Sequence, residues 1–221
     1  MRAGEDDLRA GLRALKLELT DLQVGLLLEY RDLIGKWTKV YNLTAVRDPA
    51  EMMTHHLLDS LAAVMPLRQH LEKTGLDQGI RLLDVGAGAG LPGVVIAICC
   101  PNVAVSCVDT VAKKAAFIKQ AALALKLPNL TGLHARVENV TQTFDVICSR
   151  AFASLPDFTK WSVAALAEQG VWMAMKGKNP VDELAALPVS VEVFHVEQLQ
   201  VPGLDAERCI VWMRPGLQPT P

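Results

Sequence analysis

A short stretch with alternating glycines, LLDVGAGAGLPG at positions 82–93, contains residue types that suit a cofactor-binding turn. Gly86, Gly88 and Gly90 stand at alternate positions behind the acidic residue Asp84. Because glycine has no side chain and tolerates φ > 0, a ligand could pack directly on this backbone. A helix is predicted to begin just after the last of these glycines, and its free N–H groups would point at a bound ligand. The stretch therefore predicts a cofactor site between a strand and a helix.

A second acidic residue, Asp109, ends the next predicted strand, 25 residues after Asp84. This separation is near the spacing of about 20 residues at which a carboxylate accepts both hydroxyls of a cofactor ribose. NAD and S-adenosylmethionine both contain that ribose, so Asp109 does not distinguish between them.

Three features favour S-adenosylmethionine over NAD. The glycines follow G-x-G-x-G, whereas a pyrophosphate-binding turn has G-x-G-x-x-G. Asp84 would repel a pyrophosphate but would suit an ammonium and a nearby sulfonium. The predicted C-terminal hairpin also departs from a dinucleotide-binding fold. We therefore expect S-adenosylmethionine as the cofactor and methyl transfer as the reaction.

The elements that would position these residues alternate after residue 79, whereas residues 1–78 have helical patterns. Thr20 and Gln23 resemble a capping box, which predicts a helix from about Asp21 to about Lys39. Pro49 suits the first turn of another helix, which continues over Met52–Met65. We expect residues 1–78 to form a helical extension packed on a catalytic domain at 79–215, in one structural unit overall.

The alternating elements predict an α/β fold with a mostly parallel, Rossmann-like sheet. Two final strand-like runs, Val189–Leu199 and Arg208–Met213, are too close for a helical crossover, so they should form a hairpin with one antiparallel strand. Together this gives seven strands with the last one antiparallel. The other predicted strands are Arg81–Val85, Val103–Val108, Leu130–Ala135, Phe144–Ser149 and Val171–Lys176. The predicted helices between them are Leu91–Cys100, Ala112–Leu127 and Leu155–Glu168.

Composition limits the possible classes of protein. Hydrophobic residues make up 51% of the 221 residues, enough for a sizeable core. The longest apolar run is too short for a membrane helix, and the acidic start lacks a secretory h-region, so we expect a cytoplasmic protein. The five cysteines lack zinc-ligand spacing and are expected to be buried, reduced thiols, with no metal site.

The net charge of −2 is, by itself, a point against nucleic-acid binding. Positions 112–136, however, contain five cations and no acidic residue, which predicts either a basic patch or an ordinary solvated helix face. These cations are Lys113, Lys114, Lys119, Lys126 and Arg136.

Five motifs together resemble one protein family. They are VYNLTAVRDPAEMMTHHLLDSLAAV (40–64), LLDVGAGAGLPG (82–93), ARVE (135–138), SRAFASL (149–155) and MKGK (175–178). In this order they are similar to the RsmG, or glucose-inhibited division protein B, family, with the resemblance running from about Leu22 to Met213. The resemblance implies a class I S-adenosylmethionine-dependent methyltransferase that modifies N7 of a guanine in bacterial 16S ribosomal RNA. It also implies 16S ribosomal RNA or the 30S subunit as partner; for the oligomeric state, which the sequence does not reveal, a monomer is expected.

The resemblance also assigns cofactor-binding roles by motif. Gly86 and Leu91 would line the cofactor, Val137 and Glu138 would lie near its adenine, and Arg150 would touch its site. Glu138 could instead be a surface acid after a strand. Arg150 could instead be a structural ion-pair partner.

The motif after the fourth predicted strand bears on the chemistry. Methyltransferases that act on exocyclic amines often have (Asn/Asp)-Pro-Pro-aromatic there, whereas this chain has Ser149-Arg150-Ala151-Phe152. Guanine N7 has a free lone pair and no proton, so its methylation needs positioning and desolvation but no general base. We therefore predict no essential acid–base residue. Phe152 is expected either to stack on the target base or to belong to the core.

Several residues are candidate RNA contacts, and two other functions remain open. The candidates are Arg47, His56, Lys113, Lys114, Phe152, Lys176 and Lys178. We expect Asn42, Arg47, His56, Asp59 and Ser60 to form either a wall over the cofactor or an RNA contact, and Arg47 could simply pair with Asp48. His55 is expected to pack or to make a cap interaction and not to shuttle a proton. The alternative functions are an NAD-dependent oxidoreductase and a non-catalytic RNA-binding module.

Overall fold

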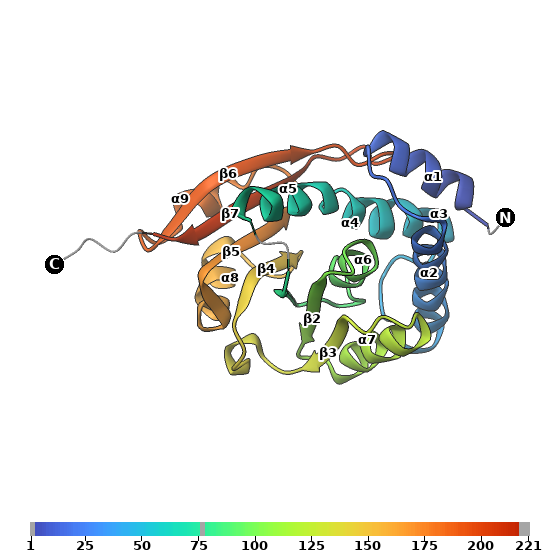
Figure 1. Cartoon of the computed structure of the whole chain (residues 1–221), viewed down its shortest axis with the longest axis horizontal. Helices are drawn as coiled ribbons and strands as arrows, with labels where there is room; N and C mark the ends of the chain where they lie inside the picture. The colour runs from blue at the N-terminus through green and yellow to red at the C-terminus, as the bar shows by residue number, and fades with distance from the viewer. Residues whose placement is uncertain (1–2, 76–77, 217–221) are drawn as a thin grey trace.

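A mixed sheet of seven strands forms the centre of the computed structural model, which describes residues 3–75 and 78–216 (Figure 1). The strand order is β3-β2-β1-β4-β5-β7-β6. β7 pairs antiparallel with both β5 and β6, and the other pairs are parallel. This confirms the predicted mostly parallel sheet with a reversed last strand. The strands are β1 (Ile80–Val85), β2 (Val103–Asp109), β3 (Leu130–His134), β4 (Phe144–Arg150), β5 (Leu166–Lys176), β6 (Val191–Leu199) and β7 (Arg208–Pro215).

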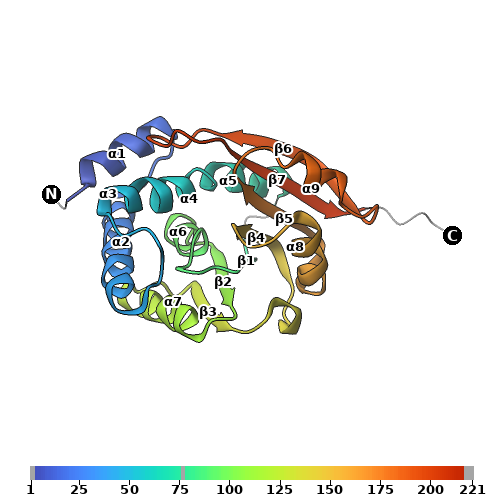
Figure 2. The same ribbon diagram turned by 180° about the vertical axis from the view of Figure 1, so that it is seen from behind.

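Helices cover both faces of the sheet, as Figures 1 and 2 show. Successive strand residues point to opposite faces, so Leu82 packs in one hydrophobic core and Leu83 in the other. The helices that follow β1 and β2 pack on the first face, and α8 packs on the second. After β1, the helical elements are α6 (Gly93–Cys99), α7 (Ala112–Ala124), η2 (Val137–Asn139), α8 (Leu155–Ser162), η3 (Val163–Ala165) and α9 (Val181–Ala185).

The N-terminal helices share the first core with the sheet. Leu8 and Leu27 are fully buried in the same cluster as Leu82. The predicted capping box is confirmed, because the Gln23 N–H donates to Thr20 Oγ1 at 3.2 Å and the Thr20 N–H donates to Gln23 Oε1 at 3.0 Å. These helical elements are α1 (Glu5–Ala14), α2 (Asp21–Tyr41), α3 (Pro49–Met52), η1 (Met53–Leu58), α4 (Asp59–Leu61) and α5 (Val64–Thr74).

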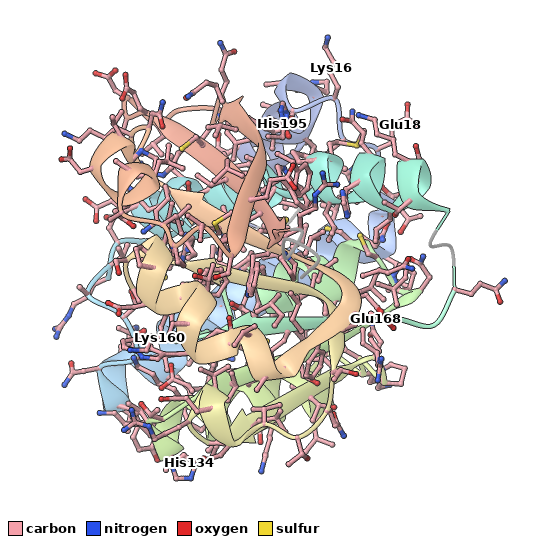
Figure 3. All side chains as sticks on the ribbon, turned by 90° about the vertical axis from the view of Figure 1, so that its left-hand side faces the viewer. Lys16, Glu18, His134, Lys160, Glu168 and His195 are labelled. Atoms are coloured by element: carbon pink, nitrogen blue, oxygen red, sulfur yellow. The ribbon has the colours of Figure 1, made fainter. Side chains whose placement is uncertain are left out.

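One predicted helix is wrong at its end. The expected helix Leu155–Glu168 stops at Ser162, and β5 begins at Leu166, where the sequence predicted a strand only from Val171. Leu166 pairs with Phe144, and the register then shifts before Val146 pairs with Val171. Because of this irregular pairing, the local sequence pattern does not reveal where the strand starts. Figure 3 shows Lys160 on α8 and Glu168 on β5 on the side of the molecule that α8 covers.

Two expectations from composition can be compared with the structure. All five cysteines are buried and unpaired, as predicted. Of the helices in the described ranges, none has both the length and the apolar character needed to cross a bilayer.

Candidate active site

The carboxyl ends of four parallel strands meet at one edge of the sheet, and two cavities open there. One, the arginine cavity, measures about 460 Å³. The other, the acidic cavity, measures about 440 Å³. The arginine cavity is lined by Leu43, Thr44, His55, His56, Asp59, Gly86, Ala87, Gly88, Ala89, Leu91, Arg150, Ala151, Met175, Lys176, Gly177 and Arg208. The acidic cavity is lined by Val85, Gly86, Val108, Asp109, Thr110, Val111, Lys114, Ala135, Arg136, Val137, Glu138, Ala151, Phe152 and Trp161.

The glycine loop borders both cavities, because Gly86 lines each of them. Gly86, Gly88 and Gly90 have φ of +66°, +59° and +85°, the left-handed region that favours glycine. A Cβ on Gly86 would overlap the ring of Phe152. A Cβ on Gly88 would meet the Gly86 carbonyl oxygen at 3.9 Å as its nearest described neighbour, so Gly88 faces open space. The backbone at Gly88 is therefore accessible to a ligand in the arginine cavity.

A tyrosine from the N-terminal helices supports this loop from behind. The Tyr30 hydroxyl donates to the carbonyl oxygens of Ala89 and Gly90, and its side chain is fully buried. The other end of the loop is held by the carbonyl of Val108, which accepts the Gly86 N–H at 2.9 Å. Gly90 thus acts as a support of the loop and lies outside the described cavity linings. Tyr30 is not among the residues predicted for the site, because its spacing in α2 is that of an ordinary core residue.

Asp109 is a buried acid in the lining of the acidic cavity. Its Oδ2 accepts the Gly88 N–H at 2.9 Å and its Oδ1 accepts the Val111 N–H at 2.8 Å. Lys114 Nζ lies 3.9 Å from Oδ2. Each carboxylate oxygen has a second lone pair, so Asp109 can hold the glycine loop and still accept a hydroxyl.

Asp84 lies beneath the loop and is not one of the described residues that line either cavity. The carboxyl is fully buried, its Oδ2 accepts the Gly93 N–H at 2.8 Å, and its Oδ1 has no hydrogen-bond partner within the described residues. Burial raises the pKa of Asp84 to about 7, against the opposing effect of the Gly93 N–H. The structure thus shows this acid supporting the start of α6.

The raised pKa of Asp84 predicts a pH dependence of stability. Its ordinary value is 3.8, so between about pH 4 and about pH 7 the folded protein keeps a proton that the unfolded chain releases. The free energy of unfolding should therefore decrease as pH rises through this window. We expect Asp84→Asn to remove this decrease. The free energy of unfolding of wild type, relative to that of the variant, should therefore fall by about 2 kcal/mol between about pH 5 and about pH 7.5. Urea unfolding of both proteins at the two pH values measures it, and parallel pH profiles would refute it.

A buried carboxylate joins two arginines in the arginine cavity. Asp59 Oδ2 accepts from Arg150 Nη1 at 2.7 Å, and Asp59 Oδ1 accepts from Arg208 Nε at 2.8 Å. Arg150 Nη1 also donates to the His55 carbonyl at 2.8 Å. That carbonyl lies in η1, a π-helix within the predicted helix Met52–Met65, and π-helical turns often occur at functional sites. Arg208 was missed because the sequence shows only a cation at the start of a strand.

His56 is buried and hydrogen-bonded in the wall of the same cavity. Its Nε2 lies 2.9 Å from Thr44 Oγ1. Burial lowers the pKa of His56, and the neighbouring Arg150 lowers it further. This histidine is therefore uncharged at neutral pH and supports the wall next to the glycine loop.

The ARVE and SRAF residues come together in the acidic cavity. The Phe152 ring packs on Gly86 and meets Trp161 edge to face, with centroids 5.9 Å apart. Glu138 is more exposed, and Arg136 Nη2 donates to its Oε1 at 3.2 Å. A hydrogen bond from its own backbone N–H, with a further contribution from Arg136, lowers the pKa of Glu138. The cavity therefore contains an ionised acid and an aromatic ring.

The lysines predicted to contact RNA differ in their surroundings. Lys176 Nζ donates to the Ala153 carbonyl at 2.8 Å and to Glu183 Oε2 at 2.7 Å, so it already has an anionic partner. Lys113 and Lys178 are exposed.

Arg47 does not pair with Asp48. Its Nη2 donates to Asn42 Oδ1 at 3.0 Å, whereas Asp48 caps the N-terminus of α3 through the N–H groups of Ala50 and Glu51. The interpretation of Arg47 as the partner of Asp48 is therefore wrong.

Comparison with known proteins places this chain among close relatives. The family model GidB, described as rRNA small subunit methyltransferase G, matches residues 23–211. Ribosomal RNA small subunit methyltransferase G of Polaromonas sp. strain JS666 is 83% identical over 214 residues, covering 97% of this chain and 95% of the relative. The protein of the same name from Polaromonas naphthalenivorans is 74% identical over 219 residues, covering 97% and 99%.

Solved structures of lower identity share the fold. A SAM-dependent methyltransferase from Aquifex aeolicus is 17% identical, with a TM-score of 0.52, covering 75% of this chain and 98% of that one. TrmN from Thermus thermophilus is 20% identical, with a TM-score of 0.53, covering 67% and 47%. These similarities show the class I methyltransferase fold. With the family match over most of its length, the chain belongs to the family of ribosomal RNA small subunit methyltransferase G.

Proposed function

We propose that this protein transfers a methyl group from S-adenosylmethionine to N7 of a guanine in 16S ribosomal RNA. The observation that carries the proposal is the pair of adjoining cavities, which share Gly86 and Ala151 across the glycine loop. The open backbone at Gly88 offers the space that this cofactor requires.

Named residues would hold the two parts of the cofactor. Asp109 and Glu138 would accept hydroxyl and amino hydrogens of the adenosine in the acidic cavity, with Val137 packing on its base. Arg150 and Leu91 would line the remainder in the arginine cavity. Asp84 and Gly90 would act indirectly, through the shape of the loop.

The residues present suit a reaction without proton removal. When bound, S-adenosylmethionine supplies a methyl group on a positively charged sulfur. Guanine N7 presents a lone pair and no proton, so the side chains need only orient the base and exclude water. Phe152 lines the acidic cavity and packs on Gly86, which lines both cavities, and it is our candidate for stacking on the target base.

This mechanism predicts a small effect for His56→Gln. A general base typically contributes a factor of about 100 to about 10,000, whereas a wall residue that keeps its hydrogen bond to Thr44 contributes much less. We expect kcat to fall less than about tenfold, a smaller effect than the loss of a general base would cause. Single-turnover methylation assays measure it, and a loss above about 100-fold would require an acid–base role for His56.

The decisive experiment is a mass-spectrometric search for 7-methylguanosine in 16S ribosomal RNA from cells with and without this protein. Methylation of naked 16S RNA and of 30S subunits by the purified protein then identifies the substrate. Absence of methyl transfer to both would favour a non-catalytic RNA-binding module, and binding of NADH alone would favour an oxidoreductase. We further propose that the protein acts as a monomer in the cytoplasm.

A further inference from the structure

A third cavity lies outside both cavities of the candidate site, between α2 and the start of α3. Its volume is about 330 Å³, and we call it the α2–α3 groove. The side chains of Lys36 and Lys39 on α2 and of Arg47 and Met52 line it. The two helices lie side by side in both ribbon views (Figures 1 and 2).

The groove is strongly cationic although the whole chain carries a net charge of −2. Four of its nine lining residues are lysine or arginine, and one, Asp32, is acidic. Asp32 Oδ1 is already paired with Arg31 Nη2 at 2.7 Å. This leaves an excess of positive charge that no lining acid neutralises.

Three of these cations are available to a partner. Lys36, Lys39 and Arg47 are exposed, and the ion pairs of residues 3–75 and 78–216 include none of them. The partner of Arg47 is the neutral Asn42 amide. An anionic ligand would therefore gain charge-assisted contacts without displacing an existing carboxylate.

One loop connects the groove to the arginine cavity. The residues between α2 and α3 place Leu43 and Thr44 in the lining of the arginine cavity and Arg47 in the lining of the groove. Three residues of extended chain span at most about 11 Å. The groove thus lies next to the cavity in which the target base would react.

We propose that the α2–α3 groove binds the phosphate backbone of the RNA strand beside the target guanine, through Lys36, Lys39 and Arg47. This inference rests on the proposed function. A polyanionic strand matches three cations that form no ion pair with any described residue, and phosphate contacts of this kind position a nucleic acid without reading its sequence. The groove supplies positive charge that the net charge of the chain does not reveal.

The test is binding of transcribed 16S ribosomal RNA by the Lys36→Gln/Lys39→Gln double variant at several salt concentrations. Removal of two phosphate contacts to single-stranded RNA should reduce the slope of log Kd against log salt by about 1.4. Affinity for RNA should fall several-fold at low salt, while the Kd for S-adenosylmethionine stays unchanged. The Lys36→Arg/Lys39→Arg variant keeps the charge and should restore the slope.

A matched control is the Lys73→Gln/Lys160→Gln variant, which makes the same charge change. Both lysines are exposed in the last turns of helices α5 and α8, which precede β1 and β5 at the opposite edge of the sheet. An unchanged salt slope in the groove variant, or an equal change in the control, would overturn the proposal. The proposal would also be overturned if the groove variant bound naked RNA normally but bound 30S subunits more weakly than wild type. A ribosomal protein would then be the partner that occupies the groove. If the groove variant showed the reduced salt slope but the wild-type protein transferred no methyl group, the proposed function would be refuted. The assignment of the groove as an RNA-binding surface would still stand.

Discussion

Gly88→Val is expected to raise the Kd for S-adenosylmethionine at least about 100-fold, which corresponds to about 2.7 kcal/mol. Gly88 has φ of +59°, and a side chain there would project into the open space of the arginine cavity. The added branched side chain therefore takes the volume that the cofactor needs, and the left-handed backbone adds a local strain of about 1–2 kcal/mol. Isothermal titration measures the Kd, and circular dichroism checks that the variant folds.

Gly75→Val is the matched control for backbone strain. Gly75 has φ of +68°, and a Cβ there would have no described atom within 4 Å, at the end of α5. The control should lose similar stability and keep its affinity for the cofactor. If Gly88→Val binds S-adenosylmethionine normally, the glycine loop is not the cofactor site.

Asp59→Ala is expected to reduce the free energy of unfolding by about 2–4 kcal/mol. The Asp59 side chain is 5% exposed, and its two oxygens bind Arg150 and Arg208 at 2.7 Å and 2.8 Å. Without the carboxylate, the two guanidinium groups face each other with side chains only 18% and 24% exposed. Water can compensate only in part for the lost partner, so the cost should be near that of breaking a buried pair. Urea unfolding monitored by fluorescence measures the change.

The exposed pair of Arg214 and Glu192 supplies a control with similar geometry. Their two hydrogen bonds measure 2.9 Å and 2.8 Å, but the side chains are 54% and 42% exposed. Glu192→Ala should therefore cost at most about 1 kcal/mol. If Asp59→Ala costs no more than this control, the arginine network does not stabilise the fold. In that case its role would be confined to ligand binding.

The seven strands along the chain and the position of the glycine loop were predictable from sequence, because both depend on local patterns. Alternating apolar runs indicated the strands, and Gly86 to Gly90 followed the first of them. The start of β5 was not predictable, because Leu166 pairs with Phe144 through an irregular register that no local pattern reveals. Strand boundaries depend on which neighbour supplies hydrogen bonds, and this is decided by tertiary pairing.

The supporting contacts of the site were also beyond sequence reasoning. Asp84 appeared to face the cofactor, yet it is buried against Gly93, and the direction of a side chain depends on the turn that follows it. Arg208 reaches Asp59 across 149 residues of chain, and Tyr30 reaches Ala89 across 59. Such long-range contacts have no signature in spacing. The sequence thus predicted a cofactor loop at Gly86 to Gly90, and the structure shows which contacts hold this loop in place.

Helix α2 serves both halves of the proposed reaction. Its buried Tyr30 supports the carbonyls of the cofactor loop, and its exposed Lys36 and Lys39 face the α2–α3 groove. A chimaera that exchanges this helix for that of another methyltransferase would alter both donor affinity and RNA affinity, and keeping the tyrosine would preserve only the donor affinity. Redesign of RNA affinity should therefore change the outward-facing lysines and leave the inward face of α2 as it is.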